Sequence, residues 1–181
     1  MSAPILNTVR PQDSLYRPLL VVDGRGAICR EVIESLPEWF GIPDSNEAFV
    51  AAAEGQAMLA CFERAGGVVG FVSLKTQTVA VMEVYVMGVK RAWHRRGIGR
   101  SLIEAAAQLA VCHGARFLTV KTLSASNPDA NYAATRLFYE AVGFLPIEEF
   151  PTLWNANNPC LLMLRSLASE ARFDPAAIRG R

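Results

Sequence analysis

Metal-ligand and disulfide patterns are what this sequence most clearly lacks. It has two histidines and four cysteines, and no two cysteines have the close spacing of a zinc site or a disulfide-rich domain. Cys29, Cys61, Cys112 and Cys160 are therefore expected to be buried free thiols in a reducing compartment. No metal site is predicted.

Long apolar runs and a strong net charge are also missing. No apolar stretch reaches about 18 residues, and the N-terminus has no basic segment followed by an apolar one. The formal net charge is only +1, which gives no general reason to expect nucleic acid or an acidic membrane as a partner. The expectation is a cytoplasmic protein with neither of these partners.

What the sequence does have is the composition of a globular domain. Its 181 residues are 51% apolar and 19% charged, which allows a sizeable core and is too apolar for a disordered chain. No repeat, low-complexity segment or linker divides them. We expect a single domain over residues 1–181 with its core at about 19–165, an irregular N-terminal lead-in and a mobile C-terminal tail.

Hydrophobic periodicity and turn residues predict the element order β-α-α-β-β-β-α-β-α-β-β. A hairpin meander followed by a β-α-β unit implies an α+β fold, in which a mixed, mostly antiparallel central sheet has helices on both faces. The predicted strands are 19–23, 57–63, 68–75, 78–89, 116–122, 144–150 and 160–164. The predicted helices are 28–36, 46–54, one that begins near 98 and is ended by Gly114, and 131–142.

The most informative segment joins the strand 78–89 to the next helix. It reads Lys90-Arg-Ala-Trp-His-Arg-Arg-Gly-Ile-Gly-Arg100, a turn that combines glycines and arginines at a helix start. The first amides of a helix lack partners and carry partial positive charge, so they suit a phosphate. Glycines let the backbone approach such a ligand closely, and arginines add charge around it. The turn predicts a ligand with a pyrophosphate group.

Two sequence blocks resemble the GNAT acetyltransferase superfamily across roughly residues 19–165. The block His94-Arg-Arg-Gly-Ile-Gly-Arg100 is similar to the family's Gln/Arg-x-x-Gly-x-Gly/Ala pyrophosphate loop. About 40 residues later, Tyr139-Glu-Ala-Val-Gly-Phe144 is similar to the Tyr-Glu-x-x-Gly-Phe of its late helix. The sequence departs from the family at two positions: His94 replaces the usual Gln/Arg, and Tyr132, with Asn131 beside it, replaces a usual Asn.

The resemblance implies acetyl-CoA as the co-substrate. The amides from Arg95 to Ser101 are expected to hold the pyrophosphate, with arginine side chains nearby. In the family, neighbouring strands splay where this chain has residues 87–89; the pantetheine lies in that gap, and an amide such as that of Val89 polarises the thioester carbonyl. The expected cofactor-binding residues are Met87, Gly88, Val89, Arg95, Arg96, Gly97, Ile98, Gly99, Arg100, Ser101 and Asn131.

Two residues are candidates for proton transfer. Tyr139 is the expected general acid, because a phenol near the sulfur can protonate the departing thiolate. Glu83 is the only charged residue between 78 and 89 and is expected to share a strand face with Tyr85 and Met87. It is either a general base for the acceptor ammonium or a structural carboxylate that is paired with an arginine or caps a strand edge.

The acceptor cannot be identified from the sequence. Trp39, Phe40 and Tyr85 are expected to line its site, although Trp39 and Phe40 could equally hold their loop against the core. Trp154, in an expected loop 151–159, has the same two interpretations. The resemblance implies direct acetyl transfer to the amine of a small molecule in a ternary complex. The alternatives are a protein or peptide acceptor, a larger acyl group, and a non-catalytic acetyl-CoA sensor. The resemblance also allows a homodimer.

Overall fold

The structure, a computed structural model, describes residues 16–167, and the expected N-terminal lead-in and C-terminal tail lie largely outside this range. The helices and strands follow one another in the predicted order. The strands are β1 (Leu19–Val21), β2 (Ala57–Phe62), β3 (Val68–Thr78), β4 (Val81–Val89), β5 (Phe117–Leu123), β6 (Leu145–Asn155) and β7 (Asn158–Ser166). The helices are α1 (Arg25–Glu34), α2 (Pro43–Gly55), α3 (Ile98–Cys112) and α4 (Ala130–Ala141), with a 3-10 turn at Arg91–Trp93.

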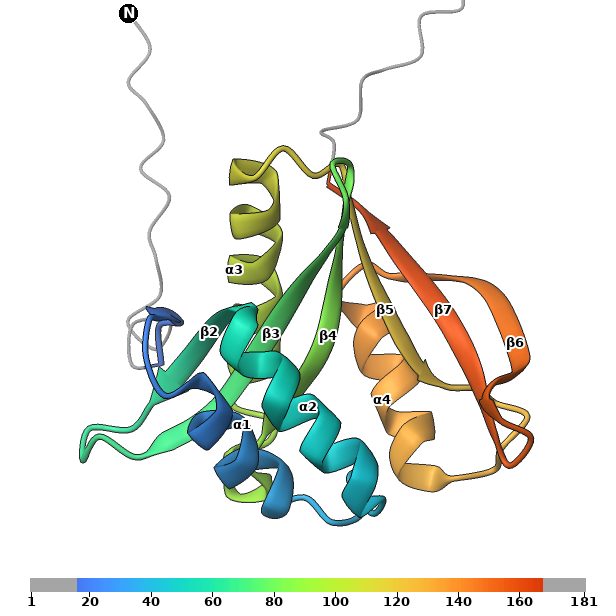
Figure 1. Cartoon of the computed structure of the whole chain (residues 1–181), viewed down its shortest axis with the longest axis horizontal. Coiled ribbons are helices and arrows are strands. Elements are labelled where there is room, and N and C mark those ends of the chain that lie inside the picture. The colour runs from blue at the N-terminus through green and yellow to red at the C-terminus, as the bar shows by residue number, and fades with distance from the viewer. Residues whose placement is uncertain (1–15, 168–181) are drawn as a thin grey trace, which may run out of the picture.

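The strands form one seven-stranded sheet in the order β1-β2-β3-β4-β5-β7-β6. Every neighbouring pair is antiparallel except β4 and β5, which are joined through α3 and run parallel. Helices α1 and α2 lie on one face of the sheet, and α3 and α4 lie on the other (Figure 1). The predicted α+β fold, with its mostly antiparallel sheet between helices, is confirmed.

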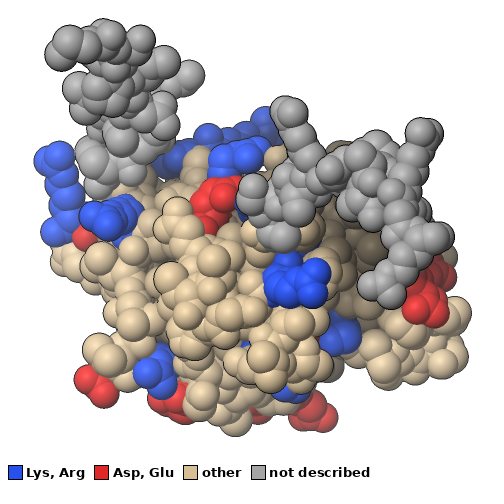
Figure 2. Space-filling view, turned by 90° about the horizontal axis from the view of Figure 1, so that it is seen from above, with Lys and Arg blue, Asp and Glu red and all other residues tan. Residues whose placement is uncertain are grey.

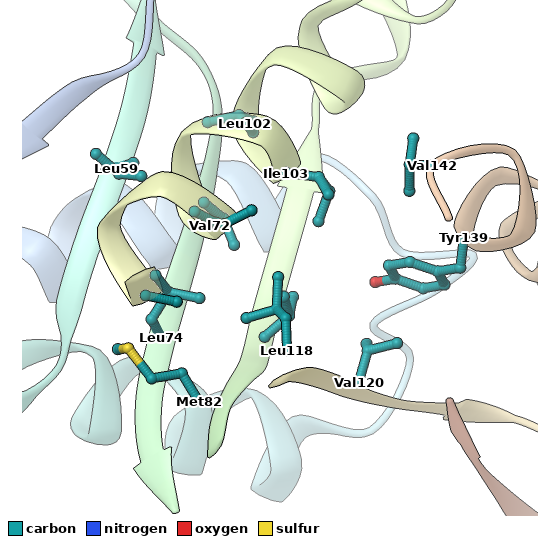
Figure 3. Packing of buried hydrophobic residues seen from close by; sticks show 14 of the residues in the cluster. Leu59, Val72, Leu74, Met82, Leu102, Ile103, Leu118, Val120, Tyr139 and Val142 are labelled. Carbon is teal, nitrogen blue, oxygen red and sulfur yellow. The ribbon is translucent and has the colours of Figure 1, made fainter. Parts of the chain in front are cut away.

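Each face of the sheet has its own hydrophobic core. Helix α3 turns an apolar stripe onto the sheet, with Leu102, Ile103 and Ala106 packed against β2 to β5 (Figure 3). On the other face, α1 contributes Val32 and Ile33 to a second cluster with the sheet. The sheet between α3 and α1 is therefore covered on both sides, which explains why β3 and β4 are so apolar.

Two predicted element boundaries were wrong. In one case a turn contains apolar residues, and in the other a strand continues through prolines. The apolar run 78–89 is not one strand: Thr78 ends β3, and the two-residue turn Val79-Ala80 precedes β4. Val79 is 89% exposed at that turn. The expected loop 151–159 is mostly strand, since β6 and β7 continue to a tight turn at residues 156–157. β6 lies at the sheet edge, where proline is tolerated.

The cysteines are free thiols in the described part of the chain, but not all are buried. Burial raises the pKa of Cys29 and of Cys61 to about 12, so both thiols stay protonated. Cys160 is buried as well. Cys112 is exposed, contrary to expectation, because it lies in the last turn of α3 on the side facing away from the sheet.

Charged side chains do not form a single patch on the face of the molecule seen in Figure 2. Lys and Arg groups are separated there by uncharged surface and by acidic groups. This distribution agrees with the small net charge of the chain.

Candidate active site

β4 and β5 pair over their first halves only. Their parallel register ends at the pair Val84–Val120, although β4 continues to Val89 and β5 to Leu123. Tyr85, directly after Val84, is a bulge residue without a partner on β3, and bulges bend a strand. The two strands then diverge (Figure 1), and a cleft of about 1240 Å³ is lined by their separated ends. The strand splaying expected from the resemblance is present.

The backbone of β4 faces this gap with unpaired groups. Val89 lies opposite Gly70 of β3, and the amide of Lys90 donates to the carbonyl of Val69 at 2.9 Å. In an antiparallel pair this pattern means that the N–H and C=O of Val89 point away from β3, toward the gap. Met87, two residues earlier, has the same orientation. Because the ladder between β4 and β5 has already ended, neither amide has a partner among the described strands.

The bulge reverses which face of the sheet a β4 side chain occupies. Glu83 lies opposite Lys75, whose Nζ is 5.5 Å from the centre of the Tyr85 ring, so these side chains share the α1–α2 face. Met87 lies opposite Val72 and packs with the core under α3. The expectation that Met87 shares a face with Glu83 was therefore wrong, because the extra residue shifts the alternation by one.

His94 connects the turn after β4 to the strand. Its Nε2 donates to the carbonyl of Val89 at 2.6 Å, and its ring lies edge-on to Trp39 with 5.9 Å between ring centres. At the position where the family usually has Gln or Arg, this chain thus has a histidine that is hydrogen-bonded to the end of β4.

The start of α3 presents free amides to the same cleft. Gly97 is the N-cap residue with φ of 80°, and the amides of residues 97–100 precede the first helical hydrogen bond. That bond runs from the amide of Ser101 to the carbonyl of Gly97 at 2.9 Å. The expected contribution of the Ser101 amide was wrong, because the helix itself uses it.

Two glycines of the predicted cofactor set make room for helices. A Cβ at Gly99 would lie 3.1 Å from the ring of Phe138, so this position lets α4 approach the start of α3. A Cβ at Gly88 would lie 3.0 Å from Val32 of α1. The missing side chain of Gly88 thus allows α1 to pack closely on β4, whereas the expectation was close approach of a ligand. Gly88 also lines the cleft.

Most basic side chains of the turn already have partners among the described residues. They are Lys90 with Glu31 (2.5 Å), Arg91 with Glu38 (2.8 Å), Arg96 over the Trp93 ring (4.7 Å) and Arg100 with the Ala141 carbonyl (2.8 Å). Arg96 does not line the cleft, contrary to expectation, because its guanidinium stacks on Trp93. Arg95 lines the cleft and its guanidinium has no ion pair or hydrogen bond to a described residue. It is also the only described non-glycine residue with positive φ, at 59°.

Tyr139 extends from α4 toward the sheet over Val120, with Val142 beside it (Figure 3). It is 6% exposed, packs edge-on against Phe144 with 5.5 Å between ring centres, and lines the cleft. Its hydroxyl has no hydrogen-bond partner among residues 16–167. Burial is the main reason that the pKa of Tyr139 is raised above its usual range, so the phenol is protonated and can donate.

Glu83 is buried in the cleft wall with both carboxylate oxygens engaged. Lys121 of β5 donates from Nζ to Oε1 at 2.6 Å, and the Gln77 amide donates to Oε2. The carboxylate is 4% exposed, so without these donors its burial would be costly. A structural Glu83 was expected to pair with an arginine, but its partner is Lys121. Each oxygen can still accept a hydrogen bond from a further donor.

A bridge crosses the cleft between the α1–α2 connection and α4. The indole of Trp39 donates to the hydroxyl of Thr135 at 3.1 Å, and the hydroxyl of Tyr132 donates to the Trp39 carbonyl at 2.8 Å. Asn131 lines the cleft beside them, and its carbonyl accepts from Thr135 at 3.0 Å. Trp39 therefore lies in the site rather than only holding its loop to the core.

An aromatic wall lines the α1–α2 side of the cleft. Phe40 packs edge-on against Phe49 of α2, and Phe49 packs edge-on against Tyr85, with 6.0 and 5.9 Å between ring centres. All three line the cleft, and so does the half-exposed Trp154 of β6. The structure thus brings the predicted acceptor residues into the same cleft as the candidate catalytic pair.

Sequence reasoning missed two polar groups in the cleft. Thr122 of β5 is 3% exposed, and its hydroxyl has no partner among the described residues. The side-chain oxygen of Asn46 in α2 is buried in the same way. Both line the cleft, and buried polar atoms without partners in a cleft indicate a ligand. No motif marks either position; only the splaying of β5 distinguishes Thr122 from an ordinary strand residue.

Splayed parallel strands that end beside a helix N-terminus match the acyl-CoA site that the motif resemblance implies. Residues 45–146 match the family model described as an acetyltransferase (GNAT) domain. The chain therefore belongs to the GNAT acetyltransferase family, and the resemblance inferred from its motifs is confirmed. Among curated proteins, none matches the chain significantly.

Solved structures share this fold at low sequence identity. A GNAT family protein from Desulfovibrio desulfuricans is 19% identical with a TM-score of 0.71, over 84% of this chain and 98% of its own. A GNAT family acetyltransferase from Elizabethkingia anophelis with acetyl-CoA bound is 12% identical, with a TM-score of 0.66 over 84% and 99%. An aminoglycoside 6′-N-acetyltransferase complexed with coenzyme A is 15% identical, with a TM-score of 0.64 over 83% and 98%.

No helix within residues 16–167 has the length and apolarity needed to cross a membrane. In the same part of the chain, no group of three or more His, Cys, Asp and Glu side chains is arranged to hold a metal ion.

Proposed function

We propose that this chain transfers the acetyl group of acetyl-CoA directly to the amine of a small molecule, with both substrates bound together. One observation carries the proposal: the gap between β4 and β5 opens to both faces of the sheet. Tyr139 adjoins it on the α3–α4 face and Glu83 on the α1–α2 face. An acyl donor and an amine could thus meet in the gap from opposite faces.

The residues present fit acetyl-CoA. The free amides of residues 97–100 and the guanidinium of Arg95 suit the pyrophosphate. The unpaired amide of Met87 suits a polar group of a pantetheine arm, and that of Val89 suits the thioester carbonyl. The Thr122 hydroxyl lies across the gap on β5. Acetyl-CoA would supply an acetyl thioester to this gap.

Three groups of the chain would serve the transfer. Glu83, with its remaining lone pairs, accepts the proton that the acceptor ammonium must lose, directly or through a water. The amide of Val89 donates to the carbonyl oxygen on which negative charge develops. Tyr139, held neutral by burial, donates its proton to the departing thiolate.

The test is release of free thiol from acetyl-CoA against a panel of amines, amino acids, polyamines, aminoglycosides and peptides. We expect turnover with at least one small amine and none without an acceptor. Turnover only with peptides, or only with longer acyl-CoA donors, would support the protein-directed or larger-acyl alternative. Tight acetyl-CoA binding without turnover on any acceptor would support a sensor.

The substitution Thr122→Val tests the proposed contact between the Thr122 hydroxyl and the pantetheine arm. Because the buried hydroxyl has no partner within residues 16–167, its loss should leave the free protein as stable as before, or more stable by up to about 1 kcal/mol. The dissociation constant for CoA, measured by calorimetry, should rise about fivefold, as loss of one neutral hydrogen bond predicts. Thr119→Val on the opposite face of β5 is the control and should leave CoA binding unchanged. Unchanged binding in Thr122→Val would exclude this contact.

Arg95 is tested by separating its charge from its backbone strain. Arg95→Ala and Arg95→Gly both remove the guanidinium, so both should raise the dissociation constant for CoA severalfold and weaken its dependence on salt. Only glycine relieves the positive φ, so Arg95→Gly should be about 1 kcal/mol more stable than Arg95→Ala in urea unfolding. Wild-type CoA affinity in both variants would remove Arg95 from the site.

A further inference from the structure

The charges on the acceptor side of the cleft are unusual for a site that must receive a cation. Glu83 is the only carboxylate among the described residues that line the cleft, and Lys121 already donates to it. Lys75 adds a second ammonium on the same face. The acceptor side therefore has two positive charges and one negative charge, which disfavours a polycation and favours an acceptor that brings a negative group of its own.

We infer that the acceptor is an aromatic α-amino acid, with its amine at Glu83 and its carboxylate at Lys75. This inference rests on the proposed acetyl transfer and specifies its substrate class. Glu83 and Lys75 are directly opposite residues on β4 and β3, so their side chains leave the sheet as neighbours. An amine and a carboxylate attached to one carbon match such a neighbouring pair of opposite charges.

Lys75 is available for this role. Its Nζ lies 5.5 Å from the centre of the Tyr85 ring, and it has no ion pair with an acidic residue in the described chain. The side chain is exposed at the rim of the cleft, so an incoming carboxylate can reach it without displacing a protein partner. Lys121, by contrast, is already paired with Glu83 at 2.6 Å.

The aromatic wall runs from this charged pair to α2. The ring of Phe49 contacts Tyr85 on one side and Phe40 on the other, and a flat substrate side chain can pack against this row of rings. At the α2 end, the side-chain amide of Asn46 donates to the Phe40 carbonyl at 2.9 Å, and its side-chain oxygen is buried with no partner in the described part of the chain. A phenol O–H or an indole N–H at the tip of the substrate would satisfy that oxygen.

The experiment compares matched acceptors that differ only in the carboxylate: tryptophan with tryptamine, and tyrosine with tyramine. An aminoglycoside serves as the polycationic comparison. We expect kcat/KM for at least one of the amino acids to exceed that of its decarboxylated partner by about tenfold or more, as one charge-assisted contact allows. Equal or higher kcat/KM for both decarboxylated amines, or a preference for the aminoglycoside, would overturn the inference.

Lys75→Met assigns the discrimination to one residue, because methionine retains an apolar stem without the charge. In this variant the preference for the amino acid over its decarboxylated partner should fall to within about twofold. Arg64→Met, in the β2–β3 hairpin and outside the cleft, is the control for loss of one positive charge and should keep the preference. A preference that persists in Lys75→Met would contradict the assignment.

Failure of this inference can be distinguished from failure of the proposed function. Calorimetric binding of acetyl-CoA, together with thiol release on any amine of the panel, reports the transferase site independently of the acceptor class. If both are present and the carboxylate is not preferred, only the substrate class is wrong. If acetyl-CoA does not bind, the proposed function is wrong as well.

Discussion

Replacing Tyr139 with phenylalanine should lower kcat by about a hundredfold, the lower end of what general acid catalysis contributes. The dissociation constant for CoA should stay within about twofold of wild type, because the ring and its contacts with Phe144 and Val120 are retained. Stability should not fall, since the hydroxyl has no partner among the described residues. Steady-state kinetics and calorimetry on the same preparation measure both quantities.

Tyr16→Phe is the matched control for this variant. Tyr16 packs edge-on against Trp93 and does not line the cleft, so its hydroxyl should be irrelevant to turnover. Because burial raises the pKa of Tyr139 above its usual value of about 10, ionisation of the acid should not lower wild-type kcat below about pH 10. A wild-type kcat in Tyr139→Phe would remove the phenol from the mechanism.

Replacing Glu83 with glutamine should lower kcat/KM about a hundredfold near pH 7, because an amide cannot accept the proton of the acceptor ammonium. The loss should disappear as the pH approaches the pKa of the acceptor amine, where the free amine is already present. A pH profile of kcat/KM for wild type and variant measures this recovery.

Lys121→Met separates the two interpretations of Glu83. It removes the ammonium 2.6 Å from the carboxylate and leaves the nearly buried Glu83 without its charge partner, so stability should fall by about 2 kcal/mol. If Glu83 is the proton acceptor, this variant keeps activity at temperatures where it is folded. Equal activity of Glu83→Gln and wild type at every pH would make the carboxylate purely structural.

The order of elements and the glycine-rich turn before α3 could be predicted from the sequence, because both depend on local patterns. The apolar stripe of α3 and the glycine after it are visible in a short window, and so are the arginines at its start. The block around Tyr139 is equally local, since the residues of one helix end define it. These features carry the family assignment, and the structure confirms the resulting fold.

The parts that could not be predicted depend on residues far apart in the sequence. Glu83 meets Lys121 only because β4 and β5 are parallel neighbours, and the pairing of Lys90 with Glu31 depends on how α1 packs. A single bulge at Tyr85 moves Met87 to the other face of the sheet, and apolar residues before and after a bulge look like any strand. For the same reason, the unpaired hydroxyl of Thr122 is apparent only in three dimensions.

The basic turn illustrates the difference between a pattern and a site. Its arginines and lysine suggest a set of charges gathered for a phosphate. In the folded chain two of these side chains form ion pairs with acids near α1, one stacks on Trp93 and one bonds to the end of α4. Arg95 and the helix amides are left for the ligand, so backbone donors provide most of the predicted phosphate site.

The central claim is that the gap between β4 and β5 holds the acyl donor with its sulfur at Tyr139. A crystal structure of the protein with coenzyme A tests it most directly. The account predicts the pyrophosphate on the amides at the start of α3, the pantetheine along Met87 and Val89, and the sulfur within hydrogen-bond reach of the Tyr139 hydroxyl. Coenzyme A bound outside the gap, or with its sulfur directed away from Tyr139, would contradict the account.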